Sequence, residues 1–273
     1  MDFDFDDATN QRISSYLADI SYVKNTVFKL DPDYLSIPFG PESNIPLASI
    51  CLQDYANTMQ SVNYGLSLAH SWKIYYREKL KEPNEDAAIV TMKYYIEDVA
   101  FRLYSAAEYL ANSIIMMLDI PPSDLTEYRK TPNSSLKIIV GLYLVDNYPD
   151  NPITKAIISL KDSIYWKKAN SYRNDLVHYQ PPTIKNLGIV YKARKKNQAW
   201  VNRWEKTSSD LNQEVFGLSA GGGDTADYFI DELLDIVQHA NFELVDTSNV
   251  IVKSYVSLLA SYGIKLTETG FTI

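Results

Sequence analysis

The sequence has very little of the residue types that build disulfides and zinc sites. It contains one cysteine and three histidines in 273 residues. A single cysteine, Cys51, excludes an internal disulfide and is typical of a reducing compartment. It stands among apolar neighbours, so we expect a buried thiol. Three scattered histidines do not form a zinc-ligand pattern. We therefore expect no metal and no other cofactor.

Long apolar runs are also missing. The longest, Ile114–Leu118, is far too short to cross a bilayer. The acidic segment Met1–Asp7 has neither the basic region nor the apolar core of a signal peptide. These observations predict a cytoplasmic protein with no membrane partner.

The composition is that of an ordinary globular domain, with 46% hydrophobic and 22% charged residues. The length allows one large domain or two small ones, and we interpret residues 1–273 as a single helical domain. The net charge of −8 argues against a protein that coats nucleic acid over its whole surface. A local basic groove remains compatible with this charge.

Apolar residues recur at helical spacing along most of the chain. The predicted helices cover residues 10–30, 46–81, about 33 residues ending at 120, 123–130, 134–145, 152–178 and 224–262. Long helices joined by short turns pack antiparallel. The fold class is therefore all-α, an up-and-down bundle of long antiparallel helices. Gly65 lies in the middle of the second helix, where it permits a close crossing with a neighbour.

The segments between these helices differ in composition. Residues 1–9 are predicted to form an acidic tail, although Phe3 and Phe5 offer a way to dock on a neighbouring helix. Residues 31–46 contain four prolines and are predicted to be an irregular connector. Residues 183–223 are interpreted as an insertion that ends in a glycine hinge, with an extended arm or hairpin at about 184–206.

The insertion is basic in an otherwise acidic chain. Residues 181–210 contain seven Lys or Arg against two acids. Basic residues mixed with aromatic ones can contact phosphates and stack on bases. The candidate RNA-binding residues are Lys167, Lys192, Arg194, Lys195, Lys196, Trp200 and Arg203. The alternative is a solvated loop with aromatic anchors.

One stretch, 171–179, brings together the densest set of side chains suited to phosphate chemistry. On a helix, Asn174 and His178 lie one turn apart on one face. Arg173 is about 140° away from that face, but its long side chain can still reach a phosphate held by the histidine. Pro181 and Pro182 end the helix, so His178 falls in its last turn. The alternative is a capping histidine and an arginine paired with an acid.

The segment from Arg173 to His178 has four residues between the arginine and the histidine, the first of them Asn174. It resembles the R-x4-6-H motif of the HEPN superfamily. This resemblance implies a helical, homodimeric, metal-independent endoribonuclease that cleaves RNA to a cyclic phosphate. It implies that His178 acts as general base or acid, that Arg173 holds the scissile phosphate, and that Asn174 orients the phosphate or the imidazole. It also suggests a defence or toxin–antitoxin system, with an antitoxin protein as partner.

Three further residues take supporting roles in this interpretation. In HEPN-like sites an acid from a neighbouring helix can support the motif, and Glu97 and Glu108 are the candidates here. One toxin subgroup has a tyrosine two residues after the histidine. In this chain Tyr179 comes immediately after it and Gln180 occupies the subgroup's position, so the chain departs from that pattern.

The same residues are compatible with other functions. A non-catalytic HEPN-type module would bind a nucleotide or a protein and keep the motif for dimer structure. A helical scaffold unrelated to the superfamily is a third hypothesis. Asp235 and His239 are one turn apart and could form half of a metal site, but we interpret them as a surface pair. The triple glycine at 221–223 lacks the following lysine of a phosphate-binding loop.

Overall fold

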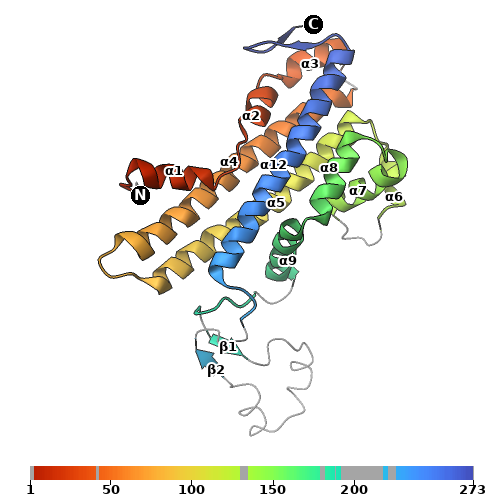
Figure 1. Cartoon of the computed structure of the whole chain (residues 1–273). Helices are drawn as coiled ribbons and strands as arrows, with labels where there is room; N and C mark the ends of the chain where they lie inside the picture. Colours follow the sequence, from red (N-terminus) through yellow and green to blue (C-terminus); the bar gives the residue numbers. More distant parts are fainter. Residues whose placement is uncertain are drawn as a thin grey trace, which may run out of the picture.

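Three long helices form the frame of the molecule (Figure 1). They are α4 (Asn44–Ile74), α5 (Glu85–Met117) and α12 (Ile230–Ser261). This computed structural model describes residues 3–40, 43–129, 135–178, 182–187, 189–191, 218–220 and 226–272. α4 and α5 run antiparallel along most of their length, and α12 packs beside them. The predicted all-α bundle is confirmed.

Local signals explain where the two central helices begin. The Ser43 side chain accepts a hydrogen bond from the Ile45 N–H, and the Asn84 side chain accepts one from the Ala87 N–H. α4 continues into a π-helical turn, η1 (Tyr75–Lys79). A Cβ atom placed on Gly65 would lie 2.8 Å from Val99 Cγ2 of α5. The glycine thus permits the close crossing that the sequence predicted.

Shorter helices cover this frame. They are α1 (Asp7–Ser15), α2 (Ser21–Val27), α3 (Pro32–Phe39), α6 (Pro122–Thr126), α7 (Leu136–Asn147), α8 (Pro152–Asp162) and α9 (Ile164–His178). The core is continuous through the bundle and includes fully buried tyrosines. The hydroxyl of Tyr255 in α12 donates to the Ile45 carbonyl of α4 at 2.6 Å. Cys51 is only half-buried, and burial raises the pKa of its thiol.

The first predicted helix is two helices. The chain breaks between α1 and α2, where the Asp19 carboxylate accepts from the Ser21 N–H at 2.8 Å and Asn63 donates to the Ala18 carbonyl at 2.8 Å. The apolar periodicity continued across this break because both helices cover the same core. Residues 3–6 are not a loose tail. The Phe3 ring lies 4.9 Å from that of Trp72, centre to centre.

The connector at 31–46 is also more regular than predicted. Asp31 caps α3 by accepting from the Asp33 N–H at 2.9 Å, and Pro32 occupies the first helical position. Both are favourable choices at a helix start. The helix ends at Gly40, whose φ of 78° suits glycine.

The helix predicted over 152–178 is divided at Ser163. Its backbone is extended there, with ψ 135°. The Ser163 hydroxyl donates to the Glu243 carboxylate of α12 and accepts from the Trp166 N–H at 3.1 Å. A contact with a distant helix therefore breaks the segment and starts α9 as a separate element. The last helix begins at Ile230, later than the predicted residue 224.

The described residues also form two small antiparallel strand pairs. β1 (Ile189–Tyr191) pairs with β2 (Leu218–Ala220), with Val190 opposite Ser219. β1 thus finds its partner beyond residue 206 and not in a local hairpin. β3 (Lys265–Leu266) pairs with β4 (Phe271–Thr272) near the C-terminus. Among the described residues, no helix combines the length and the hydropathy needed to cross a membrane.

Candidate functional site

The helix that carries the motif is fixed by its buried face. Trp166, Ala169 and Tyr172 of α9 are buried against the bundle. The Tyr172 hydroxyl donates to Glu97 Oε1 of α5 at 3.4 Å, and its ring meets the Tyr228 ring edge-on at 5.5 Å. Burial, together with the Glu97 charge, raises the pKa of Tyr172 well above its ordinary value. These contacts set the rotation of α9 and direct the next residue, Arg173, toward α5.

Arg173 packs on an aromatic ring and donates one hydrogen bond to a described residue. Its guanidinium carbon lies 3.9 Å from the centre of the Tyr104 ring. Nη1 donates to Asn174 Oδ1 at 3.2 Å, and Nε is buried without a hydrogen-bond partner. No acid in the described part of the chain forms an ion pair with it. A guanidinium held over a ring, with N–H groups that have no acceptor among the described residues, is suited to binding an anion.

A second cation lies against the same ring. Lys137 Nζ of α7 is 3.4 Å from the centre of the Tyr104 ring, and it donates to Asn170 Oδ1 at 2.9 Å. Burial lowers the pKa of Lys137 to about 7; nearby Arg173 adds to this, while Glu108 opposes it. Sequence reasoning missed this residue, because Lys137 stands in an apolar helix with no motif around it.

The two acids expected to support the motif have other partners. Glu97 accepts hydrogen bonds from Lys93 and Tyr172. It therefore helps to position Tyr172, the residue just before Arg173. Glu108 Oε2 accepts from the Leu136 N–H at 3.0 Å, at the start of α7, and its Oε1 is buried without a partner. A carboxylate is favourable at a helix N-terminus. Glu108 thereby holds the helix that presents Lys137.

His178 has different surroundings from Arg173. It is the last residue of α9 and is exposed, as is Asn174 one turn earlier. Within one chain, Arg173 packs on Tyr104 of α5 while His178 faces solvent. This agrees with the angular separation expected on a helix. Tyr179 lies outside the described residues.

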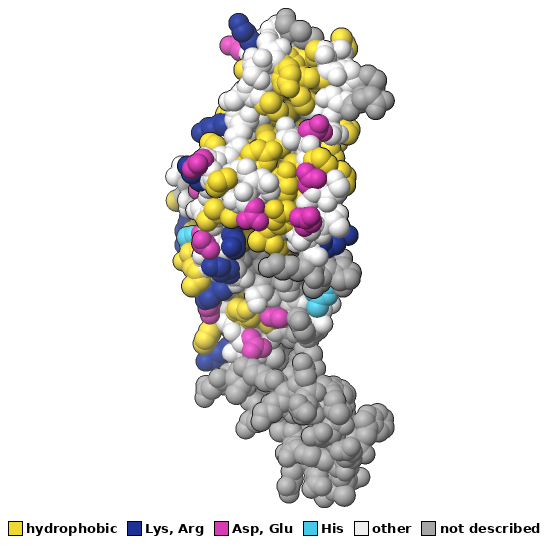
Figure 2. All heavy atoms as spheres, turned by 90° about the vertical axis from the view of Figure 1, so that its right-hand side faces the viewer, with side chains coloured by type: hydrophobic (Ala, Val, Ile, Leu, Met, Phe, Trp, Pro, Cys, Tyr) yellow, Lys and Arg dark blue, Asp and Glu magenta, His cyan; other side chains and the backbone are white. Residues whose placement is uncertain are grey.

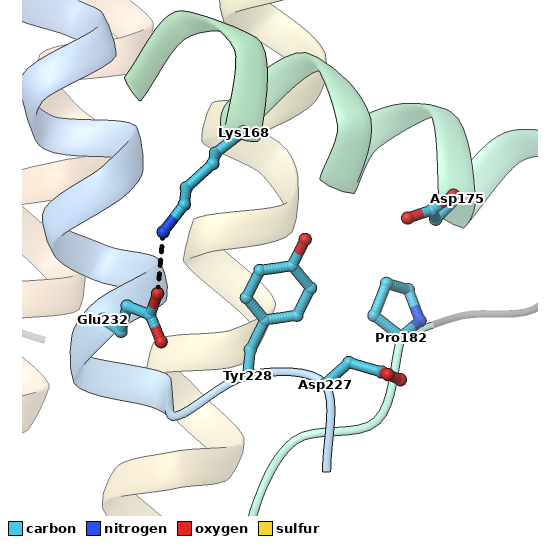
Figure 3. Close-up of a pocket in the computed structure, with 6 residues that line it drawn as sticks. All are labelled: Lys168, Asp175, Pro182, Asp227, Tyr228 and Glu232. Atoms are coloured by element: carbon cyan, nitrogen blue, oxygen red, sulfur yellow. Dashed lines mark hydrogen bonds and ion pairs between the residues drawn. The ribbon is translucent and has the colours of Figure 1, made fainter. Parts of the chain in front are cut away.

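A pocket of about 360 Å³ lies beside α9 and the start of α12 (Figure 3). Its lining residues are Lys168, Asp175, Pro182, Asp227, Tyr228 and Glu232. In Figure 3 the Tyr228 hydroxyl points toward α9, and Lys168 is paired with Glu232 at 3.0 Å. Two stretches distant in sequence, 168–182 and 227–232, form this pocket, which is why the sequence did not reveal it.

The pocket is acidic. Burial raises the pKa of the Asp175 carboxyl, and the charge of Asp227 raises it further. Burial also raises the pKa of Tyr228, with the same carboxylates contributing. Thr183 donates to Asp227 Oδ2 from its N–H at 3.0 Å and from its hydroxyl at 2.9 Å. Such a lining suits N–H donors and disfavours a phosphate. The phosphate-competent side is therefore that of Arg173.

Most of the predicted RNA-binding residues cannot be placed relative to this site. Lys167 is exposed at the surface of α9, where it donates to the Asp162 carbonyl at 3.0 Å. The following candidates lie outside the described residues: Lys192, Arg194, Lys195, Lys196, Trp200 and Arg203.

The other histidines have structural surroundings. Asp235 and His239 form an exposed pair at 3.2 Å. His70 is buried, stacks on Tyr16 and lies 2.9 Å from Gln238 Oε1. The described ranges contain no group of three or more His, Cys, Asp or Glu placed to hold a metal ion.

Comparisons with protein-family models, with curated proteins and with solved structures find no match to this chain. The case for a function therefore rests on the residues themselves.

Proposed function

We propose that this protein is a HEPN-like, metal-independent endoribonuclease that acts as a homodimer. The observation that carries the proposal is the state of Arg173. Its guanidinium is stacked on Tyr104, has a buried Nε without a partner and pairs with no described acid. A purely structural arginine would satisfy these donors with a carboxylate. An RNA phosphate supplies the missing acceptors.

Each motif residue has one role in this reaction. His178, exposed at the end of α9, takes the proton of the attacking 2′-hydroxyl or returns one to the leaving oxygen. Arg173 binds the scissile phosphate and stabilises its developing charge. Asn174, already bonded to Arg173, orients that guanidinium. The products are a cyclic phosphate and a free 5′-hydroxyl.

A dimer would bring together an arginine and a histidine that lie apart within one chain. If the two copies of α9 face each other, the histidine of one copy can approach the arginine of the other. Exposed apolar side chains near the motif support such an interface: Phe101, Ile138, Ile164 and Val177. Figure 2 shows that hydrophobic side chains also gather in a band on the face seen there. Burying such surface favours association.

The proposal is tested by assaying purified protein on mixed RNAs with EDTA present. Wild type should cleave, and Arg173→Ala or His178→Ala should lower the rate by about 10²-fold or more. His239→Ala, which changes a partly exposed histidine outside the motif, is the matched control and should cleave normally. Absence of cleavage by the wild type in EDTA would overturn the proposal.

A mixing experiment tests the shared site. Arg173→Ala and His178→Ala proteins are co-refolded so that mixed dimers form. If each site takes its arginine from one copy and its histidine from the other, a mixed dimer retains one intact site. Part of the activity should then return, although each variant alone is inactive. No recovery would mean that each site belongs to a single chain.

A second candidate is a non-catalytic HEPN-type dimer that binds a nucleotide or a partner protein. The different surroundings of Arg173 and His178 within one chain favour it. This module would bind RNA or mononucleotides without cleaving them, and His178→Ala would bind as well as the parent. We place either activity in the cytoplasm, and an antitoxin remains a candidate partner for the nuclease.

A further inference from the structure

We infer that the pocket beside α9 and the start of α12 (Figure 3) binds a guanidinium group, from an arginine side chain or a small alkylguanidine. Its volume of about 360 Å³ falls in the range of small-molecule sites, about 300–1,000 Å³. Asp175 of its lining is about 200° around α9 from Arg173. The inference therefore concerns another side of the helix and does not depend on RNA cleavage.

The charges of the lining favour a cation. Three of the lining residues are acids, Asp175, Asp227 and Glu232, and one is a base, Lys168. Lys168 pairs with Glu232 at 3.0 Å, so the lysine is already engaged by one acid of the pocket. A positively charged ligand would therefore meet more negative than positive charge here.

Asp175 is the carboxylate on which the inference rests. Within the described ranges it has no hydrogen bond and no ion pair. Burial raises its pKa, and the charge of Asp227 raises it further, so both effects disfavour the ionised form. Lys185 Nζ, from the adjoining segment, lies 4.9 Å from the centre of the Phe229 ring, and Lys185 does not line the pocket. A cation that binds at Asp175 supplies the missing opposite charge.

The other acceptors are held in place on different segments. Thr183 donates to Asp227 Oδ2 from its N–H at 3.0 Å and from its hydroxyl at 2.9 Å, and the Asp227 N–H donates to Thr183 Oγ1 at 3.0 Å. Glu232 lies in the first turn of α12, while Asp175 belongs to α9. Acceptors that approach from different directions match a ligand group with several N–H donors.

Tyr228 adds a neutral acceptor among these acids. Its hydroxyl points toward α9 (Figure 3), and its ring meets the buried Tyr172 ring edge-on at 5.5 Å. Burial raises its pKa, and the charges of Asp175, Asp227 and Glu232 raise it further. The hydroxyl therefore keeps its proton, and its lone pairs can accept an N–H from the ligand.

A guanidinium fits this arrangement better than an ammonium. It is planar, carries several N–H donors in a fixed fork and is less strongly hydrated than an ammonium. It can therefore bond to Asp175 and to a second acceptor at once. The ring of Pro182, which also lines the pocket, offers apolar surface to the alkyl stem of the ligand.

The test titrates the full chain with three probes in a calorimeter at neutral pH. They are agmatine, the blocked peptide acetyl-glycyl-arginyl-glycinamide, and the same peptide with citrulline in place of arginine. Citrulline keeps the shape of the side chain but has an uncharged urea. We expect saturable binding of one guanidinium per chain, about tenfold or more tighter than binding of the citrulline peptide. Tighter binding of agmatine than of the arginine peptide would identify a free alkylguanidine as the ligand, and the reverse would identify an arginine side chain.

Two variants locate the binding. Asp175→Asn keeps the shape of the side chain without its charge and should weaken guanidinium binding by about tenfold or more, because a charge-assisted hydrogen bond is lost. Asp246→Asn changes an exposed acid elsewhere on α12 and should bind as the parent does. Asp175→Asn removes an unpaired charge, so we expect it to be at least as stable as wild type in urea. Agmatine should raise the urea midpoint of wild type and leave that of Asp175→Asn almost unchanged.

Three results would each overturn the inference. They are no binding of either guanidinium probe to wild type, equally tight binding of the citrulline peptide, and unchanged affinity in Asp175→Asn. None of these measurements requires cleavage. A protein that binds the guanidinium probes but cuts no RNA would remove the nuclease proposal and leave this inference standing, and the opposite pair of results would do the reverse.

Discussion

The guanidinium carbon of Arg173 lies 3.9 Å from the centre of the Tyr104 ring, with no acid of the described chain paired to it. The ring therefore takes the place that a carboxylate usually fills beside a half-buried arginine. This arrangement holds the positive charge in position and leaves it available to an anion from outside. The first prediction follows from this contact.

Replacing Tyr104 should weaken anion binding through the loss of its ring. Tyr104→Leu removes the shorter cation–π contact of Arg173 and that of Lys137, each worth about 0.5–2 kcal/mol. We expect sulfate affinity and any RNA cleavage to fall by several-fold or more. Tyr104→Phe keeps the ring and should behave as the parent. If Tyr104→Phe is as defective as Tyr104→Leu, the hydroxyl is responsible and the ring contact is not.

Adding a methyl group at Gly65 should destabilise the bundle. The new Cβ would lie 2.8 Å from Val99 Cγ2, and overpacking of this kind costs about 1–3 kcal/mol. The better helix propensity of alanine offsets about 1 kcal/mol. Urea denaturation should therefore show a net loss of up to about 2 kcal/mol for Gly65→Ala.

Gly141→Ala is the matched control for that substitution. Gly141 also lies inside a helix, but a Cβ there would meet Ile157 Cγ2 at an ordinary 3.5 Å. This variant should gain up to about 1 kcal/mol from helix propensity. Equal effects at the two glycines would contradict the close packing of α4 on α5.

His70 should make the protein sensitive to mild acid. Burial lowers its pKa to about 4 in the folded state, against about 6.5 in an unfolded chain. The unfolded chain therefore binds more protons between these values. Stability is full above about pH 6.5 and declines as pH falls toward 4, by up to about 3 kcal/mol.

The His70 prediction is checked by measuring the free energy of unfolding from pH 7 to pH 5. Wild type should lose stability across this range, and His70→Gln should show a flatter profile. His239→Gln alters an exposed histidine and should keep the wild-type slope. A parallel decline in His70→Gln would show that other groups set the acid sensitivity.

Arg77 should stabilise the end of the bundle more than a typical surface arginine. It bonds Glu85 at the start of α5 through Nε at 2.8 Å, and Asp231 of α12 through Nη1 at 2.8 Å. Its side chain is 20% exposed, against 43% for Arg102, which pairs with Asp98 within one helix. Charge-assisted hydrogen bonds of this kind contribute about 1.5–3 kcal/mol.

We expect Arg77→Met to lose about 1–3 kcal/mol of stability in urea denaturation. Arg102→Met should lose no more than about 0.5 kcal/mol, because an exposed i,i+4 pair contributes little. Raising the salt to 1 M should reduce the difference only partly, since Arg77 is shielded from solvent. Similar losses for the two variants would contradict a special role for Arg77.

Two helix starts have local causes that stand in the sequence. Asn84 caps α5 and Asn151 caps α8, each through a hydrogen bond to a backbone N–H a few residues ahead. Such signals act within one turn of chain, so the sequence displays them directly. The break at Ser163 was not predictable in this way, because its cause is a hydrogen bond to Glu243, far along the chain.

The motif residues could be selected from the sequence, but their neighbours in space could not. Arg173, Asn174 and His178 were recognised from spacing on one helix, and α9 carries all three. Lys137, Tyr104 and the acidic pocket beside Asp175 had no local signal. Each enters the site only because helices distant in sequence pack together.

The sequence by itself determined that most of the chain is helical, and it placed a guanidinium, an amide and an imidazole on one helical segment. It could do so because those properties depend on residues within a turn or two of each other. Tertiary structure alone decided that Arg173 and Lys137 share one aromatic ring and that His178 faces solvent. The rotation of α9 about its axis depends on which of its side chains the bundle buries, and only long-range packing settles that.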